Sequence, residues 1–164
     1  MTLYFIRINP QILESYLQDP DLLKQDYFTE EGVKKATNVY DIDKSWDGII
    51  YLLTGKNSSD SSEPLSRLMF SNQLIDAEQD LGTGPAHFLN VQEVWQLQQQ
   101  IKDIDPHALK AKFNAGAMKE LGVYPNNVWD EAAVDDYLIE YFETVQEIFA
   151  LAAENREAII TFMQ

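Results

Sequence analysis

Residues 2–8 are TLYFIRI and residues 158–163 are AIITFM, and these two runs decide the fold. Both are rich in β-branched and aromatic side chains, which is typical of strands. The segments between them have the spacing of helices. A strand near each end, with helices between, predicts that the two ends pair in one small sheet. The sequence therefore predicts a mostly helical α+β fold, as a single domain over residues 1–164.

Apolar spacing and capping residues predict where the main helices lie. Apolar side chains at spacings of four, three and four predict a helix over residues 42–54, which Gly55 ends. Asn90 begins another helix with a capping-box pair. The longest helix is predicted over residues 131–153, with Asp130 as its N-cap.

The charge of the chain excludes two classes of partner. Twelve Lys and Arg stand against 27 Asp and Glu, which gives a formal net charge of −15. Residues 121–164 hold nine acids and one base, Arg156, so more than half of the net negative charge lies there. A protein that follows a phosphate backbone or an anionic membrane surface needs the opposite sign. We therefore expect neither a nucleic acid nor a membrane as a partner.

The absence of cysteine limits both location and chemistry. It rules out disulfides, thiolate metal sites and a cysteine nucleophile, and it fits a reducing, cytoplasmic location. We expect the N-terminal run to be a strand and not a signal peptide, and no apolar stretch of the sequence is long enough to cross a membrane. The histidines are His87 and His107 alone, which supply a transition-metal site poorly. We expect no metal and no cofactor.

The segment DIDKSWD at residues 41–47 carries the most specific candidate chemistry. On the predicted helix, Asp43, Asp47, Ile50 and Thr54 fall on one stripe at spacings of four, three and four. Two carboxylates one turn apart can work as an acid and a base, or hold a cation. The structural alternative is that Asp43 caps the helix, Asp47 favours its positive end and Thr54 closes its last turn.

Five motifs occur in a characteristic order. They are DIDKSWDGIIYLLTG at 41–55, PLS at 64–66, GPA at 84–86, EVW at 93–95 and YP at 124–125. Their order and spacing resemble the YfbM-like domain family of unknown function, and the resemblance covers essentially the whole chain. It implies a compact α+β domain of bacterial cytoplasmic type, and it implies no activity.

Two positions depart from the pattern of that family. Family members often carry His at the position of Ile50, and often carry Arg at the position of His87. If the family uses the helix histidine as a catalyst, this member has lost it. The resemblance therefore weakens an enzyme interpretation of this chain.

The first functional hypothesis is a non-enzymatic interaction protein, of the antitoxin or immunity type, with a basic protein partner. Asp136, Glu140, Glu143 and Glu147 fall on one stripe of the C-terminal helix at three- and four-residue spacings. Like charges at those spacings destabilise a helix by a few tenths of a kcal/mol per pair, roughly. An acidic stripe also speeds and orients the approach of a basic partner. The structural alternative is a solvated acidic face.

The second hypothesis is a small-molecule enzyme or ligand binder. Its site would combine side chains of the predicted helix with two from loops: Asp43, Lys44, Trp46, Asp47, Thr54, His87 and Tyr124. A concavity beside the two aspartates would support this hypothesis, whereas carboxylates that face solvent or backbone amides would contradict it. The sequence leaves open whether the chain is an enzyme and which oligomeric state it adopts.

Overall fold

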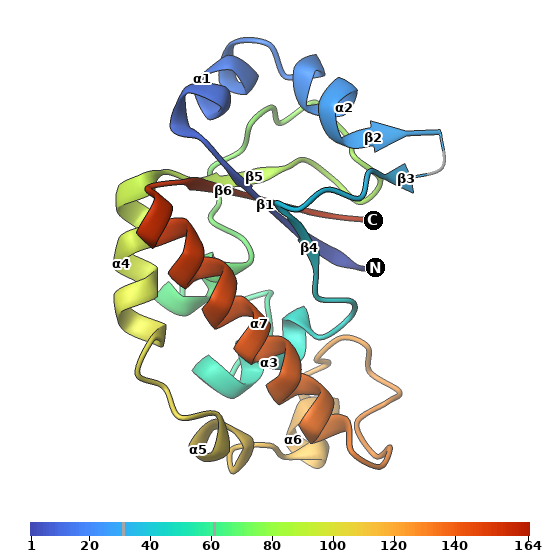
Figure 1. Ribbon diagram of the computed structural model, residues 1–164. Coiled ribbons are helices and arrows are strands. Elements are labelled where there is room, and N and C mark those ends of the chain that lie inside the picture. The colour runs from blue at the N-terminus through green and yellow to red at the C-terminus, as the bar shows by residue number, and fades with distance from the viewer. Residues whose placement is uncertain (31, 61) are drawn as a thin grey trace.

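The two terminal strands are the central pair of an antiparallel sheet. The computed structural model describes residues 1–30, 32–60 and 62–164. The sheet has the order β4-β1-β6-β5 and crosses the middle of Figure 1. Its strands are β1 (Leu3–Ile8), β4 (Val39–Asp41), β5 (His87–Leu89) and β6 (Ala158–Met163). Leu3 lies opposite Met163 and Ile8 opposite Ala158, so the predicted pairing of the ends is confirmed.

Helices cover both faces of this sheet because side chains alternate along its strands. Leu3 and Phe5 belong to the larger hydrophobic core, whereas Ile6 and Ile8 belong to a smaller one. The smaller core lies under α1 (Pro10–Gln18) and α2 (Asp21–Tyr27), above the sheet in Figure 1. The larger core is formed with α3 (Trp46–Thr54), α4 (Val91–Ile101) and α7 (Val134–Asn155). The fold is thus the predicted α+β single domain.

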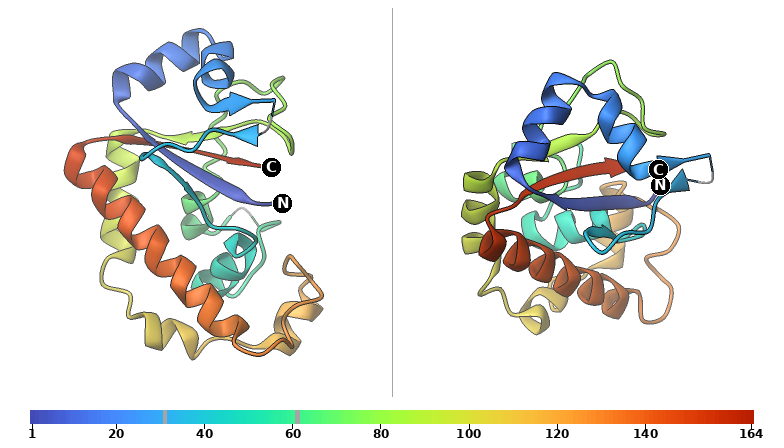
Figure 2. Two further views of the ribbon diagram at one scale, coloured as in Figure 1. Left: turned by 45° about the vertical axis from the view of Figure 1, so that its right-hand side comes forward. Right: turned by 45° about the horizontal axis from the view of Figure 1, so that its top comes forward.

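The remaining elements are short. They are β2 (Phe28–Thr29), β3 (Gly32–Val33), the 3₁₀ helix η1 (Pro64–Leu68), α5 (Pro106–Lys110) and α6 (Ala115–Glu120). The left view in Figure 2 shows α7, drawn in orange to red, reaching the sheet where β6 begins. Among the described residues, no helix is long and apolar enough to cross a membrane.

Helix α3 begins at Trp46, so the prediction of a helix over residues 42–54 is wrong at its start. Asp43 has a φ of 45°, in the left-handed region, which breaks a right-handed helical path. Ile42 is fully buried even so, because it follows β4 and its amide donates to the Leu3 carbonyl at 3.0 Å. The helical spacing of apolar residues therefore includes Ile42, which lies before the helix begins.

Helix α7 also begins later than predicted. Its N-cap is Ala133, with a φ of 62° and no side-chain cap, so the prediction of Asp130 as the cap is wrong. Asp130 instead pairs with Lys119 at 2.7 Å. The buried side of α7 supplies seven side chains to the larger core. They are Val134, Leu138, Phe142, Val145, Ile148, Phe149 and Ala152.

Candidate functional site

Asp47 holds two loops in place. It lies in the first turn of α3 and is 2% exposed. Its Oδ1 accepts a hydrogen bond from the Ser58 amide at 2.6 Å, and its Oδ2 accepts one from the Tyr124 amide at 2.7 Å. Both carboxylate oxygens therefore bind backbone amides, which are strong, charge-assisted contacts. The structural alternative places Asp47 at the positive end of its own helix, whereas both amide partners lie in loops outside α3.

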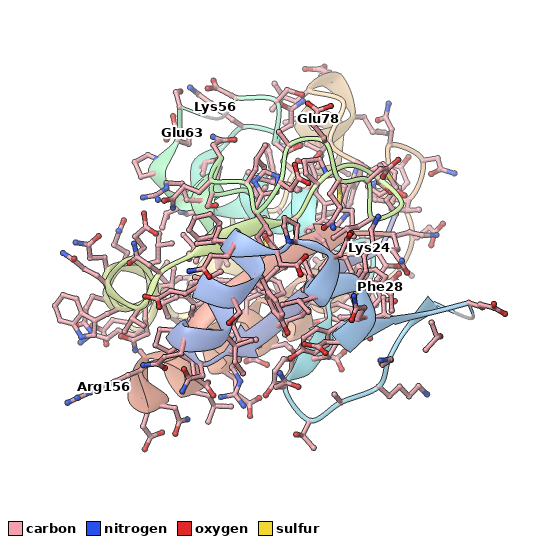
Figure 3. The ribbon with its side chains drawn as sticks, turned by 90° about the horizontal axis from the view of Figure 1, so that it is seen from above. Lys24, Phe28, Lys56, Glu63, Glu78 and Arg156 are labelled. Atoms are coloured by element: carbon pink, nitrogen blue, oxygen red, sulfur yellow. The ribbon has the colours of Figure 1, made fainter. Side chains whose placement is uncertain are left out.

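The end of α3 and the loop after it are joined by Thr54 and Lys56. The Thr54 hydroxyl donates to the Ile50 carbonyl at 2.7 Å and accepts from the Lys56 amide at 3.1 Å, so Thr54 closes the last turn. The Lys56 ammonium pairs with Asp60 at 2.8 Å and with Glu63 at 3.1 Å; Lys56 and Glu63 lie side by side in Figure 3. Ile50 itself is fully buried, so this position of the stripe faces the core.

Asp43 does not share a helical stripe with Asp47, because it lies before α3 begins. It does not cap the helix either, since Ser45 occupies the N-cap position. Its Oδ2 accepts from the Tyr137 hydroxyl at 3.0 Å, and that hydroxyl accepts from the Lys44 amide at 3.2 Å. Burial, together with the bond to Asp43 and its charge, holds the pKa of Tyr137 well above its ordinary value. The two aspartates therefore have different partners and do not form one site.

Four rings from four segments form a continuous row. Trp46 stacks on Tyr124 with ring centroids 5.1 Å apart and meets Phe70 edge-on at 5.5 Å, and Phe70 meets His87 at 5.5 Å. The Trp46 indole N–H donates to the Met1 carbonyl at 3.2 Å, and the Met1 amino group donates to the Tyr124 hydroxyl at 2.7 Å. The row brings three of the predicted residues together through ring contacts, as in a packed core.

His87 is held as an acceptor within this row. Its Nδ1 accepts from the Asn72 amide at 3.2 Å, so the proton of the neutral ring lies on Nε2. Burial lowers the pKa of His87 below its ordinary value, which keeps the ring neutral at pH 7. No group of three or more His, Asp or Glu side chains in the described part of the chain is placed to hold a metal ion.

A cavity of about 260 Å³ lies where the approach to α3 meets the start of α7. Asp43, Lys44, Glu131 and Tyr137 supply its polar lining, and the rest is mainly apolar. The loop that precedes α7 forms one wall and is drawn in orange in Figure 2. Of the seven residues predicted for a ligand site, Asp43 and Lys44 line this cavity.

Sequence reasoning missed the other walls of the cavity. Trp129 is 1% exposed, and its indole N–H donates to the Val123 carbonyl at 2.9 Å, which fixes the ring against the cavity. Tyr137, from the first turns of α7, also lines the cavity and is absent from the predicted site. The available signal was a tryptophan in a short loop just before a helix, where a large ring needs a packing partner.

The acids of α7 fall into two kinds. Glu140, Glu143 and Glu147 are exposed, and none forms an ion pair with another residue that the structure describes. Asp136 differs, because its carboxylate lies 2.5 Å from the Lys110 ammonium. The stripe predicted from sequence is therefore partly neutralised at its N-terminal end and free further along the helix.

Known proteins resemble this chain over nearly its whole length. The family model described as "Domain of unknown function (DUF1877)" matches residues 1–162. Protein YfbM of Escherichia coli (strain K12) is 26% identical over 135 residues, which cover 78% of this chain and 75% of that protein. The crystal structure of YfbM from Escherichia coli, titled a protein of unknown function, matches with a TM-score of 0.72 at 21% identity and covers 98% of each chain. This last likeness shows a common fold.

Proposed function

The chain belongs to the DUF1877 family of domains of unknown function, and we propose that this member is a non-enzymatic binding protein for a basic protein partner. Its binding surface is the α7 acidic face, which we define as Glu140, Glu143 and Glu147. An immunity-type inhibitor, which covers a basic protein and blocks it, fits this role. The proposal includes a cytoplasmic location, which the absence of cysteine supports.

The unpaired state of the α7 acidic face carries the proposal. Three carboxylates at helical spacing repel one another, and no neighbouring cation within the described chain compensates them. A partner that brings Lys or Arg side chains relieves this repulsion and is drawn in by the negative field of the chain. Such a gain is largest when the acids stand on a rigid support.

The packing of α7 supplies that rigid support. Leu138, Phe142 and Val145 are fully buried on the inner side of the helix. On one flank, the Gln146 side-chain amide donates to the Ile101 carbonyl at 2.7 Å, which ties α7 to the end of α4. The α7 acidic face therefore keeps one geometry before a partner arrives, which lowers the entropic cost of binding.

The alternative, an enzyme built on Asp43 and Asp47, has less support. Both oxygens of Asp47 are occupied by backbone amides, so this carboxylate is not free for acid–base work. Ile50 is buried where the resembling family often has a histidine. His87 accepts a backbone hydrogen bond within a packed aromatic row.

A charge-reversal experiment tests the proposal. The variant Glu140→Lys/Glu143→Lys/Glu147→Lys and the native protein serve as baits in lysate of the source bacterium at low and moderate salt, and captured proteins are quantified by mass spectrometry. We expect the native bait to enrich one or a few basic proteins that the variant loses. The purified partner should then bind the native protein with an affinity that falls as salt rises.

A matched control separates the site from net charge. The variant Glu14→Lys/Glu78→Lys/Glu120→Lys makes the same change in charge at exposed acids outside α7. We expect it to keep the partner. Equal capture by all three baits, or equal loss in both variants, would refute a binding surface on α7.

A further inference from the structure

We propose that the cavity at the start of α7 binds a lysine or arginine side chain of the basic partner. The inference rests on the proposed function for the identity of the partner, whereas the cavity can be tested alone. Its volume of about 260 Å³ is slightly below the ~300–1,000 Å³ of typical small-molecule sites. It therefore fits one extended side chain better than a large ligand.

The walls of the cavity suit a long side chain with a charged end. Val128, Trp129 and Val134 give an apolar lining, against which the aliphatic stem of Lys or Arg can pack. Tyr137 adds an aromatic ring, and such rings attract cations through their faces. An anion or a neutral polar group gains no such attraction from the face of the ring.

The polar groups of the lining favour a cation. Two acidic residues, Asp43 and Glu131, and one basic residue, Lys44, belong to the lining. Oδ2 of Asp43 accepts from Tyr137, while its Oδ1 makes no hydrogen bond to another described residue and can accept one from a guest. A guanidinium or ammonium group at this oxygen would form a charge-assisted hydrogen bond.

The cavity is continuous in charge with the α7 acidic face. Burial raises the pKa of Tyr141, and so do the negative charges of Asp41, Asp43 and Glu140. The ring of Tyr141 meets that of Tyr137 at 5.0 Å, and Tyr137 lines the cavity, so these charges act close to the cavity. A basic partner that lies along α7 can thus place one side chain in the cavity and others on the face.

The start of α7 brings the positive end of a helix dipole, which would favour an anion. Asp135 and Asp136 lie in the first turn and oppose this effect. Lys110 pairs with both, at 3.3 and 2.5 Å, so one negative charge of the two remains. The local balance stays negative.

Small analogues of the guest test the cavity directly. Butylguanidinium, butanol and butyrate are titrated into ¹⁵N-labelled protein, with the Trp129 indole N–H as the reporter in NMR spectra. We expect saturable binding of butylguanidinium with a dissociation constant of about 1–10 mM, and weaker binding of the other two. Asp43→Asn should weaken butylguanidinium binding about fivefold, and Lys44→Met should strengthen it.

A filling variant with a matched control completes the test. Ala132→Phe places a ring at the lining and should abolish binding, whereas Ala150→Phe makes the same change at an exposed site further along α7 and should leave binding intact. Thermal melts of both variants establish that they fold. Equal or better binding of butyrate or butanol, or the absence of saturable shifts at Trp129, would overturn the inference.

A second variant distinguishes failure of the cavity from failure of the proposed function. Glu143→Lys/Glu147→Lys changes the α7 acidic face and leaves every cavity-lining residue in place. If only the proposed function fails, this variant keeps both butylguanidinium binding and the native set of captured proteins. If only the cavity fails, the variant loses the partner, while butylguanidinium binds neither it nor the native protein.

Discussion

Asp43 and Asp47 are four residues apart and have opposite surroundings. Asp47 is buried, and each of its carboxylate oxygens accepts a hydrogen bond from a backbone amide in a distant loop. Asp43 is half-buried beside a cavity, with one bond from Tyr137 and an oxygen left over. A buried carboxylate whose two oxygens both accept hydrogen bonds from backbone amides supports the fold. A carboxylate beside a cavity, with one oxygen free, can instead accept a hydrogen bond from a bound ligand.

The strongest test of this contrast is Asp47→Ala. It leaves the Ser58 and Tyr124 amides without their acceptor, so we expect a loss of about 3 kcal/mol in the free energy of unfolding. Urea denaturation followed by circular dichroism measures it. Asp47→Asn keeps one acceptor oxygen and should lose about half as much. A loss below about 1 kcal/mol in Asp47→Ala would contradict the supporting role.

Removing the partner of Asp43 should cost less. Tyr137→Phe deletes the hydroxyl that donates to Asp43 and accepts from the Lys44 amide. Because both groups lie near solvent and can bind water, we expect a loss of about 1 kcal/mol. The same urea titration applies, with Tyr141→Phe as the control that keeps the Asp43 bond. A loss as large as that of Asp47→Ala would make the two aspartates alike.

Changing the charge of Asp43 itself should affect stability least. Asn tolerates the left-handed conformation at this position, and its amide oxygen can still accept from Tyr137. We expect Asp43→Asn to change the free energy of unfolding by no more than about 0.5 kcal/mol, while it weakens butylguanidinium binding. A strong destabilisation would assign Asp43 to the fold as well.

High pH offers a further test of the Asp43–Tyr137 pair. The pKa of Tyr137 is raised in the folded protein, so an unfolded chain releases this proton first, near pH 10. This contribution to stability is complete below pH 10 and is lost as pH rises further. Urea unfolding at pH 9, 10 and 11 should therefore show a smaller decline for Tyr137→Phe than for the native protein. Equal declines would contradict a raised pKa.

The sheet and the helix caps with local signals could be predicted from the sequence. The two terminal strands are confirmed because their β-branched and aromatic runs have no competing helical spacing. The capping box of Asn90 and Glu93 is confirmed because both partners lie within one turn. Such features depend on a few neighbouring residues, which a sequence displays directly.

The start of α3 and the surroundings of the candidate residues could not be predicted. Ile42 satisfies the helical spacing by chance, since the pairing of its amide with β1 buries it instead. The stacking of Trp46 on Tyr124 joins segments far apart in the chain, and no local pattern encodes it. The same holds for Tyr137 and Asp43, whose contact depends on how α7 packs.

The pairing of the chain ends has a mechanical consequence. The Thr2 amide donates to the Gln164 carbonyl at 2.5 Å and the Gln164 amide donates to the Thr2 carbonyl at 3.0 Å, so the two ends lie side by side, as Figure 1 shows. A force that pulls the ends apart acts across β1 and β6 and loads their hydrogen bonds one pair at a time. We therefore expect optical-tweezers measurements to find a domain that unzips at low force from its central strands, whatever its resistance to urea.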